Sequence, residues 1–407
     1  MTLDELPFLP AWPPTIAPLV WVAVLLLAAI LAGEAARRWL DTSRVVGYLA
    51  VGCLLGPQLA GVIDHATLAQ LRIVVDIAFG LLLFELGQRV DLTWLQRNPW
   101  LLVSSVLEAA FTFVAVFLLL SLFDVRPVAA AAAGMIAVAT SAAVVITGVK
   151  DLRAQGQVTE RVLLFTALNT AYAVIGMPLL FGWVHFETAR PVATMLLHPL
   201  YLLAGSLLLA GALAWALIRL LRAFGRRTSF QFALTLATVL TTVALADMFN
   251  FSVPLTLLAL GVLARLIDRD RHFASLRFPE TAMLFVVLLF ALTGASLEFR
   301  GWAQALPLAV GLVGARFVGK LAPVLLLARP SSLAMRKASL INLGLMPMSA
   351  LALLMLAELT REAPDIAREI AAGIHLAITI LAFAGPPILH YALRTAGEAV
   401  DTAGDLR

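Results

Sequence analysis

Long apolar runs, separated by short polar loops, recur along all 407 residues of the chain. Runs of about 17 to 25 apolar residues are long enough to cross a hydrocarbon core of roughly 30 Å as a helix. The two-residue alternation typical of a membrane β-barrel is absent from these runs. The pattern therefore predicts an all-α integral membrane protein with about thirteen transmembrane helices. Their approximate limits are 16–36, 45–63, 70–88, 99–122, 127–148, 160–182, 194–219, 229–249, 252–267, 279–298, 304–327, 335–358 and 368–391.

Composition supports this fold class and limits the partners. Hydrophobic residues make up 61% of the sequence and charged residues 13%, whereas about a quarter of the residues in soluble domains are charged. The net charge is +4, but the basic residues lie in short loops between apolar runs and not in one patch. We therefore expect a chain surrounded by membrane lipid, with no nucleic-acid partner. Cys53 is the only cysteine, and no cofactor motif or metal cluster is present in the sequence.

The distribution of basic residues predicts the orientation of the chain. An odd number of spans places the two termini on opposite sides of the membrane. Loops on the side of the C-terminus hold most of the Lys and Arg residues, at 37–44, 89–97, 150–161, 219–227, 265–277, 329–337 and 394–407. Loops on the other side hold Arg72, Arg126, Arg190, Arg300, Arg361 and Arg368. Cytoplasmic loops are enriched in Lys and Arg, so we expect an outside N-terminus and a cytoplasmic C-terminus in the inner (plasma) membrane.

The two halves of the chain resemble each other. "LLLFELGQRVDL" (81–92) is echoed by "VLLFALTGASLEF" (287–299), and a helix rich in small residues follows two spans later in both halves. An odd number of spans separates the two units, so they have opposite orientations in the membrane. Inverted repeats of this kind are typical of secondary transporters. We predict a single transmembrane domain over 1–407, with a first repeat region and linker helix at 16–219, a second repeat at 229–391 and a cytoplasmic tail at 392–407.

Corresponding segments of the two repeats have the composition of broken helices. "GMIAVATSAAVVITG" (134–148) contains Thr140 and Ser141, and "NLGLMPMSALALL" (342–354) contains Pro347 and Ser349. Proline and glycine interrupt helical hydrogen bonding, and backbone groups freed at membrane depth are tolerated where they line a cavity. Close packing with a proline kink would explain either segment alone, but explains their corresponding positions less well. The two segments are therefore candidate crossing helices.

Four stretches resemble those of a known transporter family, in the same order along the chain. They are "VVGYLAVGCLLGPQLAG" (45–61), "FGLLLFELGQRVDL" (79–92), "TSAAVVI" (140–146) and "LFVVLLFALTGASLEF" (284–299). They resemble the monovalent cation:proton antiporters, especially the branch with potassium-efflux antiporters and bacterial sodium/proton exchangers. The resemblance covers about 45–390. It implies thirteen helices, a scaffold through which two copies form a homodimer, and a core of spans four to six and eleven to thirteen that moves like an elevator.

The sequence departs from this family at the expected ion site. The sixth helix of the family carries Asn-Asp or Gln-Asp, whose carboxylate binds the cation or a proton in competition. Here the pair falls on Asn169 and Thr170 in "LLFTALNTAYAVIG" (163–176). A threonine hydroxyl offers an oxygen ligand, but it does not titrate near neutral pH. Arg89 also stands where the family usually has an acid, and we expect it to pair along its helix with Glu85.

Three ionisable residues lie in the middle of predicted spans. They are Glu108 in span four and Arg316 and Lys320 in span eleven. A charge at the bilayer centre costs at least about 2.5 to 3.5 kcal/mol, so each is a candidate functional residue with an expected partner. Under the repeat offset Glu108 corresponds to position 315, so Glu108 is expected to meet Arg316 or Lys320. The resemblance implies that a basic residue of this span pairs with the core carboxylate, and Arg316 fits that motif better than Lys320.

We therefore predict a secondary active transporter, not an enzyme, that exchanges a monovalent cation (Na⁺ or K⁺) for protons. Glu108, with Lys320 or Arg316, would replace the missing acid as the titrating group, while Asn169, Thr170, Thr140 and Ser141 supply neutral oxygens. A purely structural ion pair is the other interpretation of these charges. Two further functions remain open: a transporter of an anion or organic solute without proton exchange, and a sensor or subunit that has lost transport.

Overall fold

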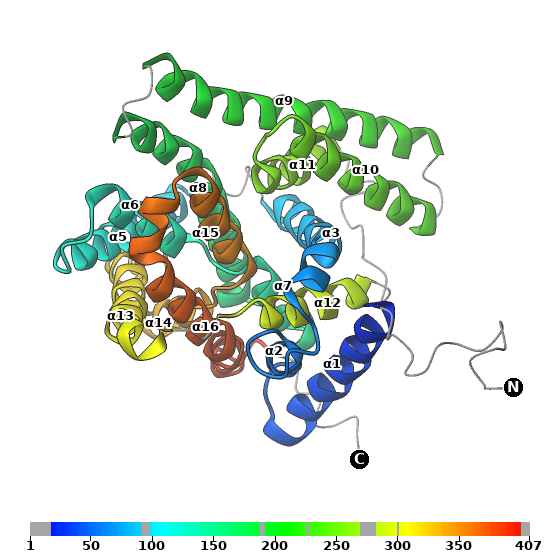
Figure 1. The fold of residues 1–407 in the computed structure, drawn as a ribbon, viewed down its shortest axis with the longest axis horizontal. Helices are drawn as coiled ribbons and strands as arrows, with labels where there is room; N and C mark the ends of the chain where they lie inside the picture. The colour runs from blue at the N-terminus through cyan, green and yellow to red at the C-terminus, as the bar shows by residue number, and fades with distance from the viewer. Residues whose placement is uncertain are drawn as a thin grey trace, which may run out of the picture.

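A computed structural model describes residues 18–90, 98–187, 192–224, 228–268, 282–298 and 301–399 (Figure 1). These residues form fifteen helices and no strand. The helices are α1 (Pro18–Leu40), α2 (Arg44–Leu55), α3 (His65–Arg89), α5 (Pro99–Ser121), α6 (Pro127–Val138), α7 (Ala142–Asp151), α8 (Gln157–Glu187), α9 (Val192–Phe224), α10 (Thr228–Met248), α11 (Val253–Ile267), α12 (Ala282–Ala295), α13 (Trp302–Leu326), α14 (Met335–Gly344), α15 (Ala350–Glu362) and α16 (Pro364–Thr395).

Thirteen predicted spans correspond to fifteen helices because two spans are broken. The span predicted at 127–148 is α6 followed by α7, and the span at 335–358 is α14 followed by α15. Both breaks fall in the segments chosen from their Gly, Pro and Ser residues. By length and composition, eight segments of the described chain can cross a membrane, or up to nine with the bent α3 counted as one span. α2, α11 and α12 are shorter apolar helices.

Some predicted limits are wrong by several residues. The span predicted at 45–63 ends at Leu55, because Gly56 takes an extended conformation and the chain then turns back. The amide of Ile63 donates to the carbonyl of Leu55 at 2.9 Å, which closes this turn. α16 begins at Pro364 and continues to Thr395, so it takes up the start of the predicted tail. Residues 400–407 of that tail lie outside the described residues.

The helices form two bundles that lie side by side (Figure 1). The core bundle contains α5 to α8 and α13 to α16, with α13 packed against α5 and α16, and α6 against α5 and α8. The scaffold bundle contains α1 to α3 and α9 to α12, with α11 packed against α3 and α9, and α12 against α2. The bundles meet where α8 contacts α9 and α11, α3 contacts α7, and α16 contacts α2. This division corresponds to the scaffold, and to the core of spans four to six and eleven to thirteen, that the family resemblance implied.

Glycine explains the close crossing of α2 and α12 in the scaffold. A Cβ atom at Gly52 would lie 1.8 Å from the carbonyl oxygen of Ala291, and one at Gly294 would lie 2.2 Å from that of Leu49. Only hydrogen fits at either position, so the two backbones pack directly on each other. Small residues at helix contacts are the usual means of close packing in membranes. The glycine-rich stretch at 45–61 therefore encodes a helix contact.

Loop ends rich in charge meet at one face of the molecule, which we call the basic face. Three ion pairs join helix ends there: Arg44 with Asp151, Lys150 with Glu85, and Arg394 with Asp41. α8 begins at the same face, where the carboxylate of Glu398 accepts hydrogen bonds from the first amides of that helix. The opposite face holds the ends of α10 and α15. Arg44, Lys150 and Arg394, which belong to three of the loops predicted to share one side of the membrane, thus lie on one side of the structure.

Candidate functional site

The two broken helices cross at their breaks, and the site is built around this crossing. The amide of Ser141 donates to the carbonyl of Pro347 at 2.9 Å, and the hydroxyl groups of Ser141 and Ser349 lie 2.6 Å apart. These two serines are separated by 208 residues, close to the offset between the two repeats. A pseudo-two-fold axis therefore passes close to this hydroxyl pair. Ser141 also caps α7, because its hydroxyl accepts a hydrogen bond from the amide of Val144 at 3.4 Å.

α13 supplies a cation to the carbonyl end of each broken helix. Lys320 donates from Nζ to the carbonyl of Val138 at 3.2 Å, where α6 ends. Arg316 donates from Nη2 to the carbonyl of Leu345 at 3.0 Å, immediately after α14. Val138 and Leu345 occupy nearly corresponding positions in the two repeats. The carbonyl end of a helix carries a partial negative charge, so each cation lies where the breaks concentrate that charge.

Glu108 of α5 pairs with Lys320 of α13. Both side chains are fully buried, and Lys320 Nζ donates to Glu108 Oε1. Glu108 Oε2 has no hydrogen-bond partner among the described residues. The pair depends on the close approach of α5 and α13, since a Cβ atom at Gly319 would lie 2.6 Å from Cα of Thr112. The predicted partnership of Glu108 is therefore present, through Lys320, whereas Arg316 bonds a backbone carbonyl.

The polar pair on α8 adjoins the first break. Asn169 donates from Nδ2 to Thr140 Oγ1 at 3.4 Å, and Thr140 in turn lies 3.4 Å from the carbonyl oxygen of Leu345. Asn169 and Thr170 are fully buried. Asn169 Oδ1 and Thr170 Oγ1 have no hydrogen-bond partner in the described part of the chain. A buried polar atom without a partner is costly, so these oxygens are available to a water molecule or a cation.

The structure thus places the seven predicted site residues in one buried region, and hydrogen bonds involve six of them. Asn169, Thr140 and Ser141 are linked through the breaks, Arg316 joins them at the carbonyl of Leu345, and Lys320 joins Glu108 to the carbonyl of Val138. Thr170 follows Asn169 on α8, and its hydroxyl has no hydrogen-bond partner among the described residues. The contributions of Val138 and Leu345 were missed, because a backbone carbonyl leaves no mark in the side-chain pattern. Asn342, noted only as part of the second break, is fully buried with both side-chain polar atoms unpaired among the described residues.

The crossing does not open into two cavities that lie between the core and the scaffold. A cavity of about 610 Å³ opens towards the opposite face, between α3, α10, α11 and α15, and one of about 210 Å³ lies near the basic face. Their linings do not include Glu108, Asn169 or Thr170. A third cavity of about 10 Å³ adjoins Arg316, which is close to the smallest space that holds one water molecule. Access to the site from either of the two larger cavities therefore requires a change of conformation.

Comparison with known proteins supports the assignment from the fold and the site. The sodium/hydrogen exchanger transmembrane family matches residues 22–393. The sodium proton antiporter MjNhaP1 from Methanocaldococcus jannaschii, in its structure at pH 8, superposes with a TM-score of 0.68 at 14% sequence identity, over 93% of this chain and 96% of that one. Its electron-microscopy structure gives a TM-score of 0.67 over 94% and 96% of the two chains, again at 14% identity. Comparison with curated proteins gives no significant match. The family match extends over nearly the whole chain, and the chain belongs to the sodium/hydrogen exchanger family of membrane transporters.

Proposed function

We propose that this protein exchanges a monovalent cation, Na⁺ or K⁺, for protons across the inner (plasma) membrane. The observation that carries the proposal is the fully buried Glu108–Lys320 pair at the crossing of the broken helices. Exchange through one site needs a group that is anionic while it holds the cation and neutral once it is protonated. Thr170 cannot be that group. Glu108 is the carboxylate that lies beside the crossing, and it has one oxygen free of hydrogen bonds within the described residues.

Competition for Glu108 would couple the two ions. An incoming cation and the ammonium group of Lys320 would compete for the carboxylate of Glu108. Protonation of Glu108 would remove its negative charge and so weaken its attraction for both. Neutral oxygens of Asn169, Thr170, Thr140 and Ser141 would complete the coordination of the cation. The carbonyl of Val138 remains a hydrogen-bond acceptor for Lys320 when Glu108 is occupied. The ammonium group therefore keeps one partner throughout such a cycle.

The cavity on the opposite face supports a cation as the substrate. Its lining carries the carboxylates of Asp76, Asp247 and Glu358, with Arg361 as the basic residue in that set. A cleft lined by an excess of one charge raises the local concentration of the opposite ion. Since the basic face is expected to be cytoplasmic, this cavity would collect cations from outside. The division into two bundles further supports an elevator-type movement of the core, with the scaffold forming a homodimer contact.

One observation favours a different substrate. Arg316 is almost fully buried, yet its Nε and Nη1 atoms have no hydrogen-bond partner in the described chain. Arg316 and Lys320 together outnumber Glu108 at the crossing. A small anion or the anionic group of an organic solute would balance this charge. Transport of such a solute without proton exchange is therefore the second candidate.

Transport by reconstituted protein separates these functions. The purified chain is placed in liposomes that enclose a pH-sensitive dye, and gradients of Na⁺, K⁺ and Li⁺ are applied in turn. We expect cation-dependent proton movement that Glu108→Gln abolishes and Thr170→Ala retains. Thermal unfolding of both variants is measured in detergent, so that loss of transport is interpreted only where the variant is folded.

Each outcome points to one function. Normal exchange by Glu108→Gln would reject Glu108 as the titrating group. Anion-dependent currents without proton flux, lost in Arg316→Gln, would establish the second candidate. If the folded protein moved no ion or proton in any gradient, the remaining interpretation would be a sensor or subunit that has lost transport.

A further inference from the structure

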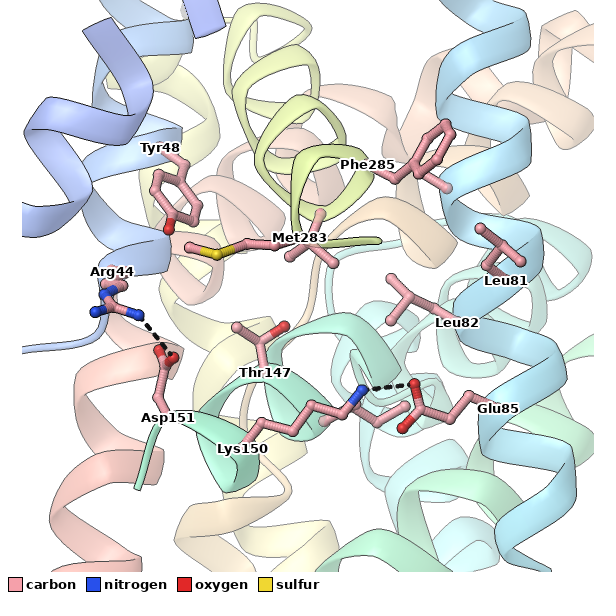
Figure 2. A pocket seen from close by; sticks show the side chains of 13 residues that line it. Arg44, Tyr48, Leu81, Leu82, Glu85, Thr147, Lys150, Asp151, Met283 and Phe285 are labelled. Carbon is pink, nitrogen blue, oxygen red and sulfur yellow. Dashed lines mark hydrogen bonds and ion pairs between the residues drawn. The ribbon is translucent and has the colours of Figure 1, made fainter. Parts of the chain in front are cut away.

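The end of α7 joins the core bundle to the scaffold bundle through two ion pairs of opposite polarity. Lys150 Nζ lies 2.8 Å from Glu85 Oε2 on α3, and Asp151 Oδ1 lies 3.7 Å from Arg44 Nη1 at the start of α2. Figure 2 shows both pairs reaching across the space between α7 and the scaffold helices. Two consecutive residues of the core thus hold two different helices of the scaffold.

Apolar packing at this junction is incomplete. A cavity of about 210 Å³ separates α7 from the scaffold, with Tyr48, Leu81 and Leu82 on the scaffold side and Ile146 and Thr147 on the core side. Thr147 points into the space between the bundles (Figure 2). Separation of surfaces that already enclose a cavity exposes less new apolar area than separation of packed surfaces, and free energy follows that area. The two ion pairs of α7, together with the pair of Arg394 on α16 and Asp41 before α2, therefore carry much of the specific contact between the bundles at this face.

The corresponding place in the second repeat has the opposite character. Under the 208-residue offset of the two break serines, Lys150 corresponds to Glu358 at the end of α15. Glu358 lines the larger cavity together with Asp76 of α3 and Asp247 of α10. Carboxylates from the core and from the scaffold therefore face the same space, and like charges repel. Core and scaffold are therefore joined by α7 at the basic face, whereas around α15 they are held apart by a cavity at the opposite face.

We propose that Lys150 and Asp151 form a latch that holds the core on the scaffold at the basic face, and that the latch breaks and re-forms in each transport cycle. The proposal rests on the elevator movement proposed above. Lys150 is the central residue, because its pair with Glu85 is the shorter and Glu85 is largely buried. Its side chain is itself 49% exposed, so water replaces the lost partner and the pair can open at low cost. Arg44 also bonds Glu34 within the scaffold, and its pair with Asp151 is the longer of the two. The Arg44–Asp151 pair therefore contributes less to the latch than the Lys150–Glu85 pair does.

Thiol accessibility tests the latch independently of transport. Cys53, the only native cysteine, is replaced by serine, and Thr147→Cys places one thiol in the cavity behind the latch. The reaction rate with a charged, membrane-impermeant maleimide is measured in detergent for Lys150→Glu, Glu85→Lys and the double exchange. Charge reversal removes one attraction and adds one repulsion, so we expect each single variant to raise the rate roughly fivefold to tenfold. The double exchange restores one acid facing two bases and is expected to return the rate to that of the parent.

Two controls separate the latch from general loosening. Arg89 bonds the other oxygen of Glu85 at 3.1 Å but belongs to the same helix. Arg89→Gln therefore removes a partner of Glu85 without breaking a contact between bundles, and should leave the rate unchanged. A thiol at Val287, which is fully buried in α12, should react slowly in every variant unless the protein unfolds.

The outcomes decide the proposal. A rise in both single variants that the double exchange reverses establishes the latch. Unchanged rates in the single variants, or the same rise in Arg89→Gln, would overturn it. The liposome assay is read separately, because reversible accessibility with no ion exchange would reject the transport function and leave the latch in place.

Discussion

Two lysine–glutamate pairs, one at the helix crossing and one at the basic face, join different helices in different surroundings. Lys320 and Glu108 are fully buried, and Lys320 also bonds the carbonyl of Val138. Lys150 is 49% exposed, and its partner Glu85 is 12% exposed and is shared with Arg89. Breaking the first pair leaves a charge in a medium of low polarity, whereas water replaces the partner in the second. The difference shows that the same chemical pair can fix a site in one place and open readily in another.

The largest effect is expected from breaking the buried pair on one side. Glu108→Leu leaves Lys320 buried without its counter-charge, which should lower the free energy of unfolding by about 3–5 kcal/mol. Adding Lys320→Met removes the unpaired charge, and most of the loss should be recovered. Unfolding in mixed micelles measures both variants. A double variant as unstable as Glu108→Leu would show that the pair is not the reason for the loss.

Separating α5 from α13 should have the next largest effect. Gly319→Ala places a methyl group 2.6 Å from the backbone of Thr112, so the helices must move apart, at a cost of about 1–3 kcal/mol. Gly314→Ala is the matched control on the same helix, since its Cβ atom meets nothing within 4 Å. That control should be neutral or stabilising by up to about 1 kcal/mol through helix propensity. Equal effects of the two variants would contradict a special contact at Gly319.

The exposed pair should contribute little to global stability. Lys150→Gln is expected to change the free energy of unfolding by less than about 1 kcal/mol, as for other partly exposed pairs. The same unfolding assay as for Glu108→Leu makes the two values directly comparable. A loss as large as that of Glu108→Leu would remove the distinction between the two pairs, and with it the reason for calling the outer one a latch.

The smallest effect is expected at Asp41, which is 75% exposed and pairs with Arg394. The hydrogen bond from Arg394 holds the pKa of Asp41 below its ordinary value. The stabilisation is therefore complete above the ordinary aspartate pKa, and it is lost as the pH falls through the lowered value. Asp41→Asn should lower stability at neutral pH by less than about 0.5 kcal/mol. Melting curves of the two proteins should converge in acid, and a difference that grew at low pH would contradict the assignment.

Much of the architecture could be predicted from the sequence, because it depends on the length of the apolar runs and on the residue types at the helix breaks. Apolar length gave the spans, and Gly, Pro and Ser marked both helix breaks. Charge at membrane depth identified Glu108, Arg316 and Lys320. The resemblance favoured Arg316 over Lys320 as the partner of the core carboxylate, but in the structure the base that pairs with Glu108 is Lys320. The two bases are one turn apart on α13 and face the same region, so their spacing does not separate them. Their backbone contacts differ, since Lys320 bonds the carbonyl of Val138 and Arg316 bonds that of Leu345. Because every residue has a carbonyl, the sequence does not indicate which carbonyl a side chain will bond.

The latch could not have been predicted from the sequence for a related reason. Glu85 was expected to pair with Arg89 by its spacing along one helix, and the structure contains that pair. The second partner, Lys150, comes from a helix 65 residues later in the chain. Local spacing predicts contacts within a helix, whereas contacts between bundles depend on how the bundles are rotated against each other.

The hydroxyl pair of Ser141 and Ser349 has a use in measurement. It lies where the two repeats meet at equivalent positions, 2.6 Å apart and close to the pseudo-two-fold axis. Rearrangements that affect both repeats equally displace atoms least near that axis. For the elevator movement proposed above, a distance from this point to the crossing of α2 and α12 would therefore report travel of the whole core, with little contribution from distortion inside it. The serine pair is therefore a suitable reference point for distance measurements on this protein in different conformations.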